Sequence, residues 1–506
     1  MFETLQVILI ILLVGLFNIL LYIRSTYFLQ MVQQLGYIPG EYKEWIANNR
    51  DKAYSFSKEK TKMSDSKKPL VYTDRAKRLL ITNTIINAVI LLALLSISFF
   101  VKLDSMAYVL YVSLIIFVAI LLYFYQSRIM MLALYIINPH EKRVNNKFYK
   151  MAQDKIKGLK INGLTVIAIT GSYGKTSTKT ILAQILSNYK RVYSSPSSFN
   201  TPMGLSKIIN NELNESHQIF IAEMGARYTG EIKELVDLVF PDIGIITNIG
   251  PCHLETFGSI ENIIKTKFEL ADGLKNKAII VNADSELVLD EANRRNLDCH
   301  KVGIDNGDLT ATIKTINENG TVFDINFADG PMEAHTKLLG RHNILNIIMA
   351  TQATIEVGMQ KEDIIKAIAN LEQVEHRLNI IKNPGGAIVI DDAFNSNPDG
   401  ARAALEVLNL FEGGKKIIVT PGMVELGDLQ ETENFKLGEE IAKMTNISVL
   451  VGKKIADDVH RGVEAAQVVD HKNYRVDTLD DATKLLGEIL SPGDVVLFEN
   501  DLTDIY

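Results

Sequence analysis

The sequence predicts an α/β protein. Transmembrane helices at the N-terminus precede a domain with a parallel-rich sheet and a phosphate-binding loop, and a smaller C-terminal Rossmann-like α/β domain follows. Three observations lead to this fold class. Nearly all the long apolar runs fall before residue 140. A short β-branched run leads into a glycine-rich turn at 170–177, and a helical pattern follows it. Short apolar runs at 416–420, 448–451 and 495–498 alternate with helical stretches, as in parallel sheets.

A chain of 506 residues is too long for one hydrophobic core. We divide it into a membrane region (1–150), a central domain (151–372) and a C-terminal domain (373–506). The net charge of −7, without a basic stripe interleaved with aromatic residues, argues against a nucleic-acid partner. The two cysteines, Cys252 and Cys299, have neither metal-site nor disulfide spacing, so we expect free thiols in a reducing compartment.

Three apolar stretches, at 5–23, 79–101 and 106–125, have the length needed to cross a bilayer as helices. They are apolar all round, which favours membrane spans over buried core helices. The first stretch lacks the basic start of a cleaved signal peptide, so we expect an anchor. Residues 129–137 either continue the third helix or lie along the membrane interface, and both readings stay open.

Loop charge predicts the orientation of these spans. The loop at 24–78 holds twelve Lys or Arg, and only residues 102–105 join the second and third spans. The positive-inside rule then places this loop and everything after residue 126 in the cytoplasm, with the N-terminus outside. We therefore expect a multi-pass protein of the cell membrane with cytoplasmic catalytic domains. The loop either contacts anionic lipid headgroups or only sets the topology. Its lysines include Lys58, Lys60, Lys62, Lys67 and Lys68.

The glycine-rich turn has the composition of an ATP-binding loop. A strand at 164–169 leads into the turn, and a helix runs on to about residue 187. In such a turn, backbone N–H groups and the helix N-terminus bind phosphate. Lys175 would neutralise the β- and γ-phosphate oxygens, and the Thr176 hydroxyl would face Mg²⁺. The common form of this loop has a glycine where Ile169 stands. The residues predicted to bind ATP here are Thr170, Gly171, Ser172, Tyr173, Gly174, Lys175, Thr176 and Ser177.

Further motifs follow the turn in order. They are Ser-Phe-Asn-Thr-Pro-Met-Gly at 198–204, Ala-Glu-Met-Gly at 222–225, Asn-Ile-Gly-Pro-Cys-His-Leu-Glu at 248–255, Asn-Ala-Asp at 282–284, Gly-Arg-His-Asn at 340–343, and Asp-Asp-Ala-Phe-Asn-Ser-Asn-Pro at 391–398. With the Thr-Gly-x-x-Gly-Lys-Thr-Ser form of the turn, they make residues 163–498 resemble the Mur ligase family. The resemblance is greatest to its D-alanyl-D-alanine-adding members.

The resemblance implies an ATP-dependent carboxylate–amine ligase. In such an enzyme a substrate carboxylate attacks the γ-phosphate of ATP to form an acyl phosphate, and an amine then displaces the phosphate. Three anionic groups have to meet, so the protein must neutralise charge and hold the groups in line. The catalytic residues carried over from the family are Lys175, Lys267, His253 and Arg377.

Four residues are carried over as ligands of Mg²⁺: Thr176, Glu223, His253 and Lys267. Hydroxyl and carboxylate oxygens suit Mg²⁺. Histidine is a softer ligand, so the role of His253 rests on the resemblance, and a histidine that merely adjoins the site is the alternative. Lys267 matches the lysine that is carbamylated in the family, which would turn a cation into an anion. A register two residues upstream would place Lys265 there instead.

The nucleotide-binding residues come from several segments. Asp391 and Asp392 follow the apolar run at 387–390, and ligands bind beyond the ends of such strands in open α/β sheets. Arg377 offers a bidentate fork to the γ-phosphate. The resemblance assigns the adenine side to Asn282, His342, Asn343 and Asn346. The last two are three residues apart on one helix face, which also suits helix capping.

Two departures from the family lie on the substrate side. The family's uridine-holding first domain has no counterpart, and the membrane region stands in its place. After 491–498 the family continues with Lys-Gly-Ser, whereas this chain reads Glu499-Asn500-Asp501.

These features lead to three function hypotheses. In the first, the protein is an ATP-dependent ligase at the membrane, in contact with its lipid. It joins an amine donor, D-alanyl-D-alanine or a related amino acid, to a carboxylate-bearing cell-wall-type precursor. In the second, the same chemistry acts on another lipid-linked or polymeric acceptor. In the third, the protein is a nucleotide-binding membrane scaffold that does not ligate. A scaffold would be free to lose the catalytic residues, so their joint presence argues against the third. No feature of the sequence predicts the oligomeric state.

Overall fold

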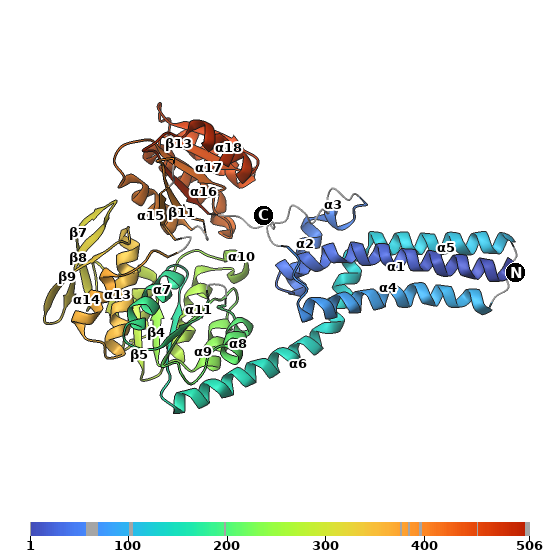
Figure 1. The fold of residues 1–506 in the computed structure, drawn as a ribbon, viewed down its shortest axis with the longest axis horizontal. Coiled ribbons are helices and arrows are strands. Elements are labelled where there is room, and N and C mark those ends of the chain that lie inside the picture. Colours follow the sequence, from blue (N-terminus) through green and yellow to red (C-terminus); the bar gives the residue numbers. More distant parts are fainter. Residues whose placement is uncertain are drawn as a thin grey trace. The chain divides into compact units, whose positions relative to one another are not determined.

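The computed structural model of the chain divides into two compact units, one ending at Asn146 and the other beginning at Lys147 (Figure 1). The division falls inside α6 (Gln126–Ile161), four residues before the predicted domain boundary. The structure describes residues 2–56, 69–100, 105–196, 199–374, 377–382, 385–393, 397–452 and 454–500. Several predicted features therefore lie outside the described residues, namely the five named lysines of the basic loop, residues 102–104, Ser198, residues 394–396 and Asp501.

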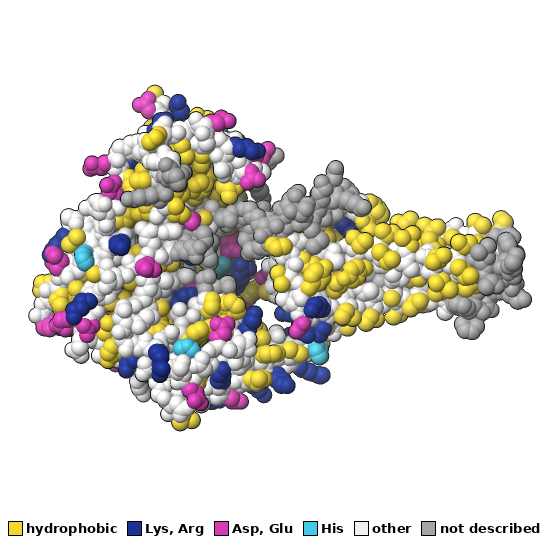
Figure 2. All heavy atoms as spheres, viewed as in Figure 1, with side chains coloured by type: hydrophobic (Ala, Val, Ile, Leu, Met, Phe, Trp, Pro, Cys, Tyr) yellow, Lys and Arg dark blue, Asp and Glu magenta, His cyan; other side chains and the backbone are white. Residues whose placement is uncertain are grey.

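The first unit contains three helices that are long and apolar enough to cross a membrane. The candidate spans, Gln6–Gln34, Asp74–Ile97 and Met106–Phe124, belong to α1 (Phe2–Gln34), α4 (Asp74–Phe100) and α5 (Ser105–Phe124). The three helices pack against one another. Their outward side chains remain apolar, as Figure 2 shows along this unit; Leu12, Val89 and Phe117 are each more than half exposed. Water is a poor solvent for so continuous an apolar surface, whereas lipid suits it.

The sequence predicted that the first span ends near residue 23, but the helix does not end there. It continues for eleven residues to Gln34. Arg24 lies inside the unit rather than at the start of a loop, because its Nη2 donates to the carbonyls of Lys52 and Ser55 at 3.1 and 2.9 Å. Its guanidinium also covers the ring of Phe28, 4.7 Å from the centroid.

Part of the predicted basic loop is helical. It contains α2 (Pro39–Asn48) and α3 (Arg50–Ala53). Tyr42 and Trp45 of α2 are buried against the end of α1 in a single apolar cluster. Beyond the third span, a turn at Tyr125 separates α5 from α6, so residues 129–137 belong to a new helix and do not continue the third.

The central part of the second unit is a six-stranded parallel sheet in the order β2-β3-β1-β4-β5-β6. Its strands are β1 (Thr165–Thr170), β2 (Val192–Ser194), β3 (Ile219–Glu223), β4 (Ile243–Ile246), β5 (Ala278–Asn282) and β6 (His300–Val302). Both faces of the sheet are buried. This explains why β1 reads as a continuous apolar run and not as an alternating one.

Successive side chains of β1 pack on opposite faces of the sheet. Val166 and Ala168 pack with α8 (Pro202–Asn211), α9 (Glu231–Val239), α11 (Ile260–Asp272), α12 (Glu286–Arg294) and the end of α6. Ile167 and Ile169 pack with α7 (Lys175–Ser187), α13 (Arg341–Glu356) and α14 (Lys361–Ala369). The isoleucine that stands in the place of the usual loop glycine is therefore a core residue.

A small antiparallel sheet, which the sequence analysis did not predict, packs on the same face as α13. It consists of β7 (Thr310–Asn317), β8 (Gly320–Phe327) and β9 (Gly330–Thr336).

Both cysteines are free, as expected.

The C-terminal part has a six-stranded sheet in the order β10-β11-β15-β12-β13-β14. The predicted parallel strands are present as β11 (Ile388–Asp392), β12 (Lys416–Thr420), β13 (Ile447–Val451) and β15 (Val495–Glu499). The structure adds β14 (Lys472–Val476), which is parallel, and β10 (Asn379–Lys382), which is antiparallel at one edge. The helices are α15 (Pro398–Asn409), α16 (Gln430–Met444), α17 (Lys454–Ala465) and α18 (Leu479–Ile489).

Two glycines let α16 and α17 touch backbone to backbone. A Cβ atom added to Gly438 would lie 2.0 Å from the carbonyl oxygen of Val459, and one added to Gly462 would lie 2.0 Å from that of Phe435. No heavy atom lies within 4 Å of a Cβ added to Gly487, which sits inside α18. Gly438 and Gly487 thus form a matched pair of helical glycines, one crowded and one free.

We expect Gly438→Ala to force the two helices apart and to cost about 1–3 kcal/mol of stability, as overpacking does. Gly487→Ala should gain up to about 1 kcal/mol, because alanine is the better helix former. The measurement is thermal unfolding of the detergent-solubilised full chain. A Gly438→Ala protein that melts at or above the wild-type temperature would contradict the close packing.

Candidate active site

The glycine-rich turn joins the end of β1 at Thr170 to the start of α7 at Lys175. Gly171 and Gly174 have φ values of 150° and 79°, in the region that favours glycine. A Cβ atom at Gly171 would lie 2.0 Å from Oγ1 of Thr247. The turn therefore admits no side chain at Gly171, where it contacts the segment after β4.

The turn is bonded to that segment along its length. The backbone N–H of Ser172 donates to the carbonyl of Asn248 at 2.6 Å, and its hydroxyl donates to that of Gly250 at 3.1 Å. The Tyr173 hydroxyl donates to the carbonyl of Pro251. Burial raises the pKa of Tyr173 above its usual range, so the hydroxyl keeps its proton. Thr170 is buried and donates to the carbonyl of Met224 at 3.1 Å, where it fixes β1 to the end of β3.

Lys175 lies folded over the turn. Its ammonium donates to the carbonyls of Gly171 and Ser172 at 2.8 and 2.9 Å. Burial lowers the pKa of Lys175, and the nearby Glu223 partly offsets this effect. The lysine thus brings a positive charge into the concave side of the turn.

Glu223 ends β3 as a buried carboxylate with three side-chain donors. The Thr176 hydroxyl and the Lys179 ammonium donate to Oε2 at 3.1 and 2.9 Å, and the Asn200 amide donates to Oε1 at 3.1 Å. Burial alone would raise the pKa of Glu223, but Lys179 and Lys175 outweigh it and hold the pKa below its usual value. Glu223 is therefore ionised at neutral pH.

The sequence analysis did not single out Lys179. It lies four residues after Lys175, hence on the same face of α7, and that spacing is the signal that could have identified it. Asn200 was part of a quoted motif but had no assigned role.

The predicted metal ligands fall into separate groups. Thr176 and Glu223 place a hydroxyl and a carboxylate side by side, a donor set that suits Mg²⁺. His253 and Lys267 have other neighbours. Within the described ranges, no three His, Cys, Asp or Glu side chains form a cluster that could hold a metal ion.

Lys267 lies on α11 with 2% of its surface exposed. Its ammonium is 5.7 Å from the ring centroid of Phe257, and it forms no hydrogen bond or ion pair with any residue the structure describes. Burial, reinforced by the charge of Lys175, lowers the pKa of Lys267 to about 8. Lys265 is exposed on the same helix. Of the two lysines, only Lys267 lies inside the protein.

His253 precedes α10 (Leu254–Phe257) and has a left-handed backbone with φ 50°. Its Nδ1 directly contacts Oε2 of Glu425, a residue of the loop after β12. The sequence analysis did not identify Glu425.

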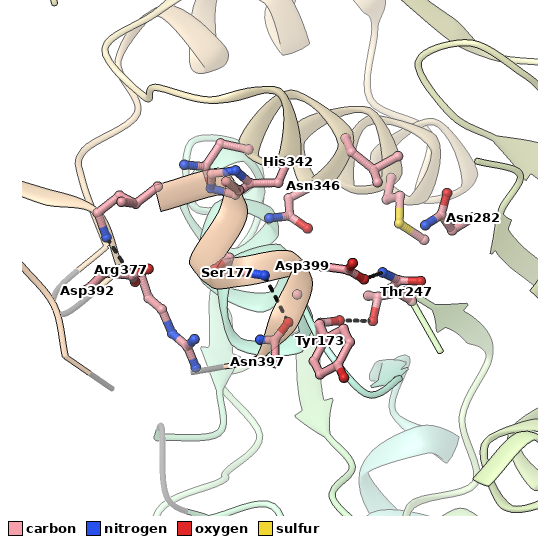
Figure 3. A pocket seen from close by; sticks show the side chains of 18 residues that line it. Tyr173, Ser177, Thr247, Asn282, His342, Asn346, Arg377, Asp392, Asn397 and Asp399 are labelled. Atoms are coloured by element: carbon pink, nitrogen blue, oxygen red, sulfur yellow. Dashed lines mark hydrogen bonds between the residues drawn. The ribbon is translucent and has the colours of Figure 1, made fainter. Parts of the chain in front are cut away.

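A pocket of about 730 Å³, open to solvent, lies beside the turn (Figure 3). Both sheet-containing parts of the second unit line it. Nine predicted residues meet there: Tyr173, Gly174, Ser177, Asn282, His342, Asn343, Asn346, Arg377 and Asp392. The sequence analysis gave no role to the other lining residues, which include Thr247, Asn248, Met349, Leu378, Asn397, Asp399 and Gly400. Figure 3 shows Asp399 of α15 reaching the segment after β4, where the Asn248 amide donates to it at 3.4 Å.

The polar side chains of α13 differ in their hydrogen bonds. The Asn343 amide donates to the carbonyl of Leu339 at 2.8 Å, and the N-cap residue of α13, Gly340, receives no side-chain cap. Oδ1 of Asn346 accepts from the Thr178 hydroxyl at 3.0 Å and abuts Gly174. Nδ1 of His342 is buried without a hydrogen-bond partner among the described residues. Burial and the charge of Arg377 lower the pKa of His342 to about 4, so the imidazole is neutral at pH 7.

Asp392 lines the pocket and Asp391 does not. Asp392 accepts from the backbone N–H of Leu378 at 3.3 Å and bonds to Glu499, which lies opposite it at the end of β15. Burial raises the pKa of Asp392, although Arg377 opposes the shift. Glu499, at a position where the sequence departs from the family pattern, therefore belongs to the wall behind the pocket.

Comparison with known proteins places the chain among enzymes. The family model of the Mur ligase middle domain matches residues 169–354, and that of the Mur ligase glutamate ligase domain matches residues 376–499. The UDP-N-acetylmuramoyl-tripeptide–D-alanyl-D-alanine ligase of Bacillus subtilis (strain 168) is 32% identical over 342 residues, which cover 67% of this chain and 73% of the relative. The chain belongs to the Mur ligase family. It is an ATP-dependent amide-bond ligase of the Mur type.

Other Mur ligases agree in sequence and fold. The corresponding ligase of Mycobacterium tuberculosis (strain ATCC 25618 / H37Rv) is 32% identical over 371 residues, which cover 69% of this chain and 72% of that one. MurF from Acinetobacter baumannii has a TM-score of 0.63 at 27% identity, covering 71% and 77% of the two chains. MurF from Thermotoga maritima in complex with ADP also has a TM-score of 0.63, at 26% identity, covering 71% and 80%. Both family models begin after the three apolar helices.

The buried ion pair between Lys179 and Glu223 leads to a prediction about the stability of the protein. We expect Lys179→Met to cost about 3–5 kcal/mol, because it removes one partner of a buried charge pair. The double variant Lys179→Met/Glu223→Gln should regain most of this loss, since it buries no unpaired charge. The measurement is the unfolding midpoint of the full chain in detergent. Equal midpoints for the two variants would show that the pair contributes little.

Proposed function

We propose that this Mur ligase joins an amine donor, such as D-alanyl-D-alanine, to a carboxylate-bearing cell-wall-type precursor at the cell membrane. ATP would first convert the carboxylate into an acyl phosphate, and the amine would then displace the phosphate. The observation that carries the proposal is the buried charge arrangement around the turn. Lys175, Lys179 and Glu223 are held there by direct contacts, which a nucleotide-binding scaffold without ligase chemistry would not need.

The phosphate side has to neutralise three anions before they can react. Lys175 already lies over the turn, where it can approach the β- and γ-phosphates. Arg377 lines the pocket with a guanidinium that suits a phosphate oxygen pair. Thr176 and Glu223 would hold Mg²⁺, which supplies charge neutralisation for the transferred phosphoryl group. Lys179 would position Glu223 by fixing one carboxylate oxygen.

The adenosine part of ATP fits the pocket in Figure 3. Asn346 abuts the turn, and the neutral His342 carries a buried Nδ1 without a partner among the described residues. Leu345 and Met349 of α13 add apolar surface of the kind that nucleotide sites offer to a base. Asn282 and Asp392 line the remaining walls.

Lys267 fits the proposed carbamate better than a bare ammonium. An ammonium 4 Å from Mg²⁺ would be repelled by about 8 kcal/mol at an effective dielectric constant near 20. Carbamate formation needs the neutral amine, and a pKa of about 8 leaves a usable fraction of that form at neutral pH. The side chain is buried, and its ammonium forms no hydrogen bond or ion pair with the residues the structure describes.

Membrane attachment is part of the proposal. The three apolar helices would span the membrane with the N-terminus outside and the ligase domains in the cytoplasm, where ATP is available. In the Mur ligase family, the domain at this place in the chain holds the uridine nucleotide of the substrate. A membrane region in its place fits an acceptor that is itself lipid-linked or close to the membrane.

The direct test is ligation by the detergent-solubilised full chain with ATP and Mg²⁺. UDP-linked and lipid-linked peptide acceptors would each be offered with D-alanine, D-alanyl-D-alanine or no donor. We expect ADP release that depends on both the acceptor and the donor, and a product of the summed mass less one water. Nucleotide binding without acceptor-dependent ADP release would favour the scaffold hypothesis.

The carbamate hypothesis predicts a contrast between two lysines of one helix. Lys267→Ala should be nearly inactive, with partial recovery in millimolar formate or acetate, because a small carboxylate can occupy the vacated anionic position. Lys265→Ala is the matched control and should stay within about twofold of wild type, because its side chain is exposed. Initial rates of ADP release measure both. Loss of activity in Lys265→Ala alone would move the site two residues upstream.

The topology can be tested with single cysteines in a Cys252→Ala/Cys299→Ser background. In intact cells, a membrane-impermeant maleimide should label Met106→Cys, which begins the third candidate span at the proposed outer face of the membrane. It should not label Glu318→Cys in the turn between β7 and β8 until the cells are opened. Labelling of residue 318 in intact cells would overturn the proposed orientation and, with it, access to cytoplasmic ATP.

A further inference from the structure

Two residues with left-handed backbones face each other between the two sheet-containing parts of the second unit. They are His253, in the segment after β4, and Glu425, in the loop after β12, with φ values of 50° and 62°. A residue other than glycine in this conformation costs about 1 kcal/mol or more. Such residues persist where surrounding contacts determine them, and they gather at active sites and ligand clamps. Their meeting at one contact therefore calls for a functional explanation.

Glu425 contacts the other side with its backbone and with both carboxylate oxygens. Its carbonyl accepts from the backbone N–H of Leu254 at 3.2 Å, and Oε2 pairs with Nδ1 of His253. Oε1 accepts from Nη2 of Arg227 at 3.3 Å. Gly427 adds a close approach, since a Cβ atom there would lie 3.1 Å from that of Leu254.

The loop that carries Glu425 is fixed from behind. Asn434 is fully buried; its Oδ1 accepts from the backbone N–H of Met423 at 2.7 Å, and its amide donates to the Met423 carbonyl at 2.9 Å. The Asn500 amide donates to the carbonyl of Gly422 at 2.7 Å. On the other side, Tyr173 of the nucleotide turn holds the carbonyl of Pro251. Glu425 thus joins a rigid loop of the C-terminal sheet to a segment anchored on the turn.

The carboxylate at Nδ1 determines what the imidazole can do. It holds the ring proton on Nδ1, which leaves the lone pair on Nε2 and fixes the plane of the ring. In metal sites, a carboxylate on the far nitrogen of a ligand histidine orients the ring and raises its basicity. A contact whose only task was to hold two parts together would need neither feature. The other pair of Glu425, with the half-exposed guanidinium of Arg227, is of the surface kind that is worth little.

We infer that Glu425 is a positioning residue, which holds the Nδ1 side of His253 so that Nε2 would be available to Mg²⁺ in the ligase reaction. The inference rests on the proposed metal role of His253. Because Glu425 comes from the C-terminal sheet, His253 acquires this orientation only when the loop after β12 is docked. Completion of the metal site is therefore tied to docking of the C-terminal part.

The test uses Mn²⁺ as the probe, bound to the full chain in detergent with saturating ADP. Its affinity is measured by electron paramagnetic resonance, and electron spin echo modulation reports a histidine nitrogen on the metal. Glu425→Ala should weaken Mn²⁺ binding about 10–100-fold and lose the nitrogen modulation. Glu425→Gln, which can still accept from Nδ1–H, should keep the modulation with a smaller loss of affinity. If Glu425→Ala does not fold, the loss of Mn²⁺ affinity in Glu425→Gln relative to Glu431→Ala decides the question.

Three controls make the result specific. Glu431→Ala removes an exposed carboxylate of α16 that pairs with Arg461, and Arg227→Ala removes the other partner of Glu425. Both should bind Mn²⁺ within about twofold of wild type. His253→Ala should lack the modulation. ADP affinity without metal should be the same in all variants.

Two different failures can be told apart. If the wild-type complex with ADP shows no protein-bound Mn²⁺ with a histidine nitrogen, the metal role of His253 in the proposed function is wrong. If the wild type shows it and the Glu425 variants match Glu431→Ala, the positioning role is wrong, and the ligase proposal stands.

Discussion

The close approach of the glycine-rich turn to the segment after β4 is the constraint on which the site depends. Gly171 lies so near Thr247 that no side chain fits between them, and the backbone of Ser172 bonds directly to Asn248. This contact sets the position of Lys175 on one side and of Pro251 and His253 on the other. The turn and the segment after β4 are thus fixed to each other by backbone contacts before any charged side chain is considered.

Burial explains how this site holds charge. Glu223 and Lys267 are buried and Lys175 is partly buried, yet the charges around the three differ. Glu223 is compensated by Lys179 and stays ionised. Lys267 has no such partner among the described residues, and its pKa falls toward neutrality. Glu223 therefore stays an anion, whereas Lys267 is an amine whose charge can change near neutral pH.

The sequence predicted those features that depend on local pattern. The strand and turn before Lys175, the strand that ends at Asp392 and the three apolar helices all have short-range signatures. Contacts between distant segments could not be predicted in this way. Glu425 is 172 residues from His253, and only the folded chain brings them together. The sequence predicts a loop from Arg24 onward because a charge interrupts the apolar stretch there, but it does not reveal the carbonyls of Lys52 and Ser55 that accept from this guanidinium.

The pocket beside the turn is lined by α13 from the central part of the second unit and by Arg377, Asp392 and α15 from the C-terminal part. A nucleotide bound there touches both parts, so its affinity contains the free energy of holding them together. Thermodynamic linkage makes this relation reciprocal. A nucleotide in this pocket would stabilise the docked arrangement by the same factor by which docking tightens nucleotide binding.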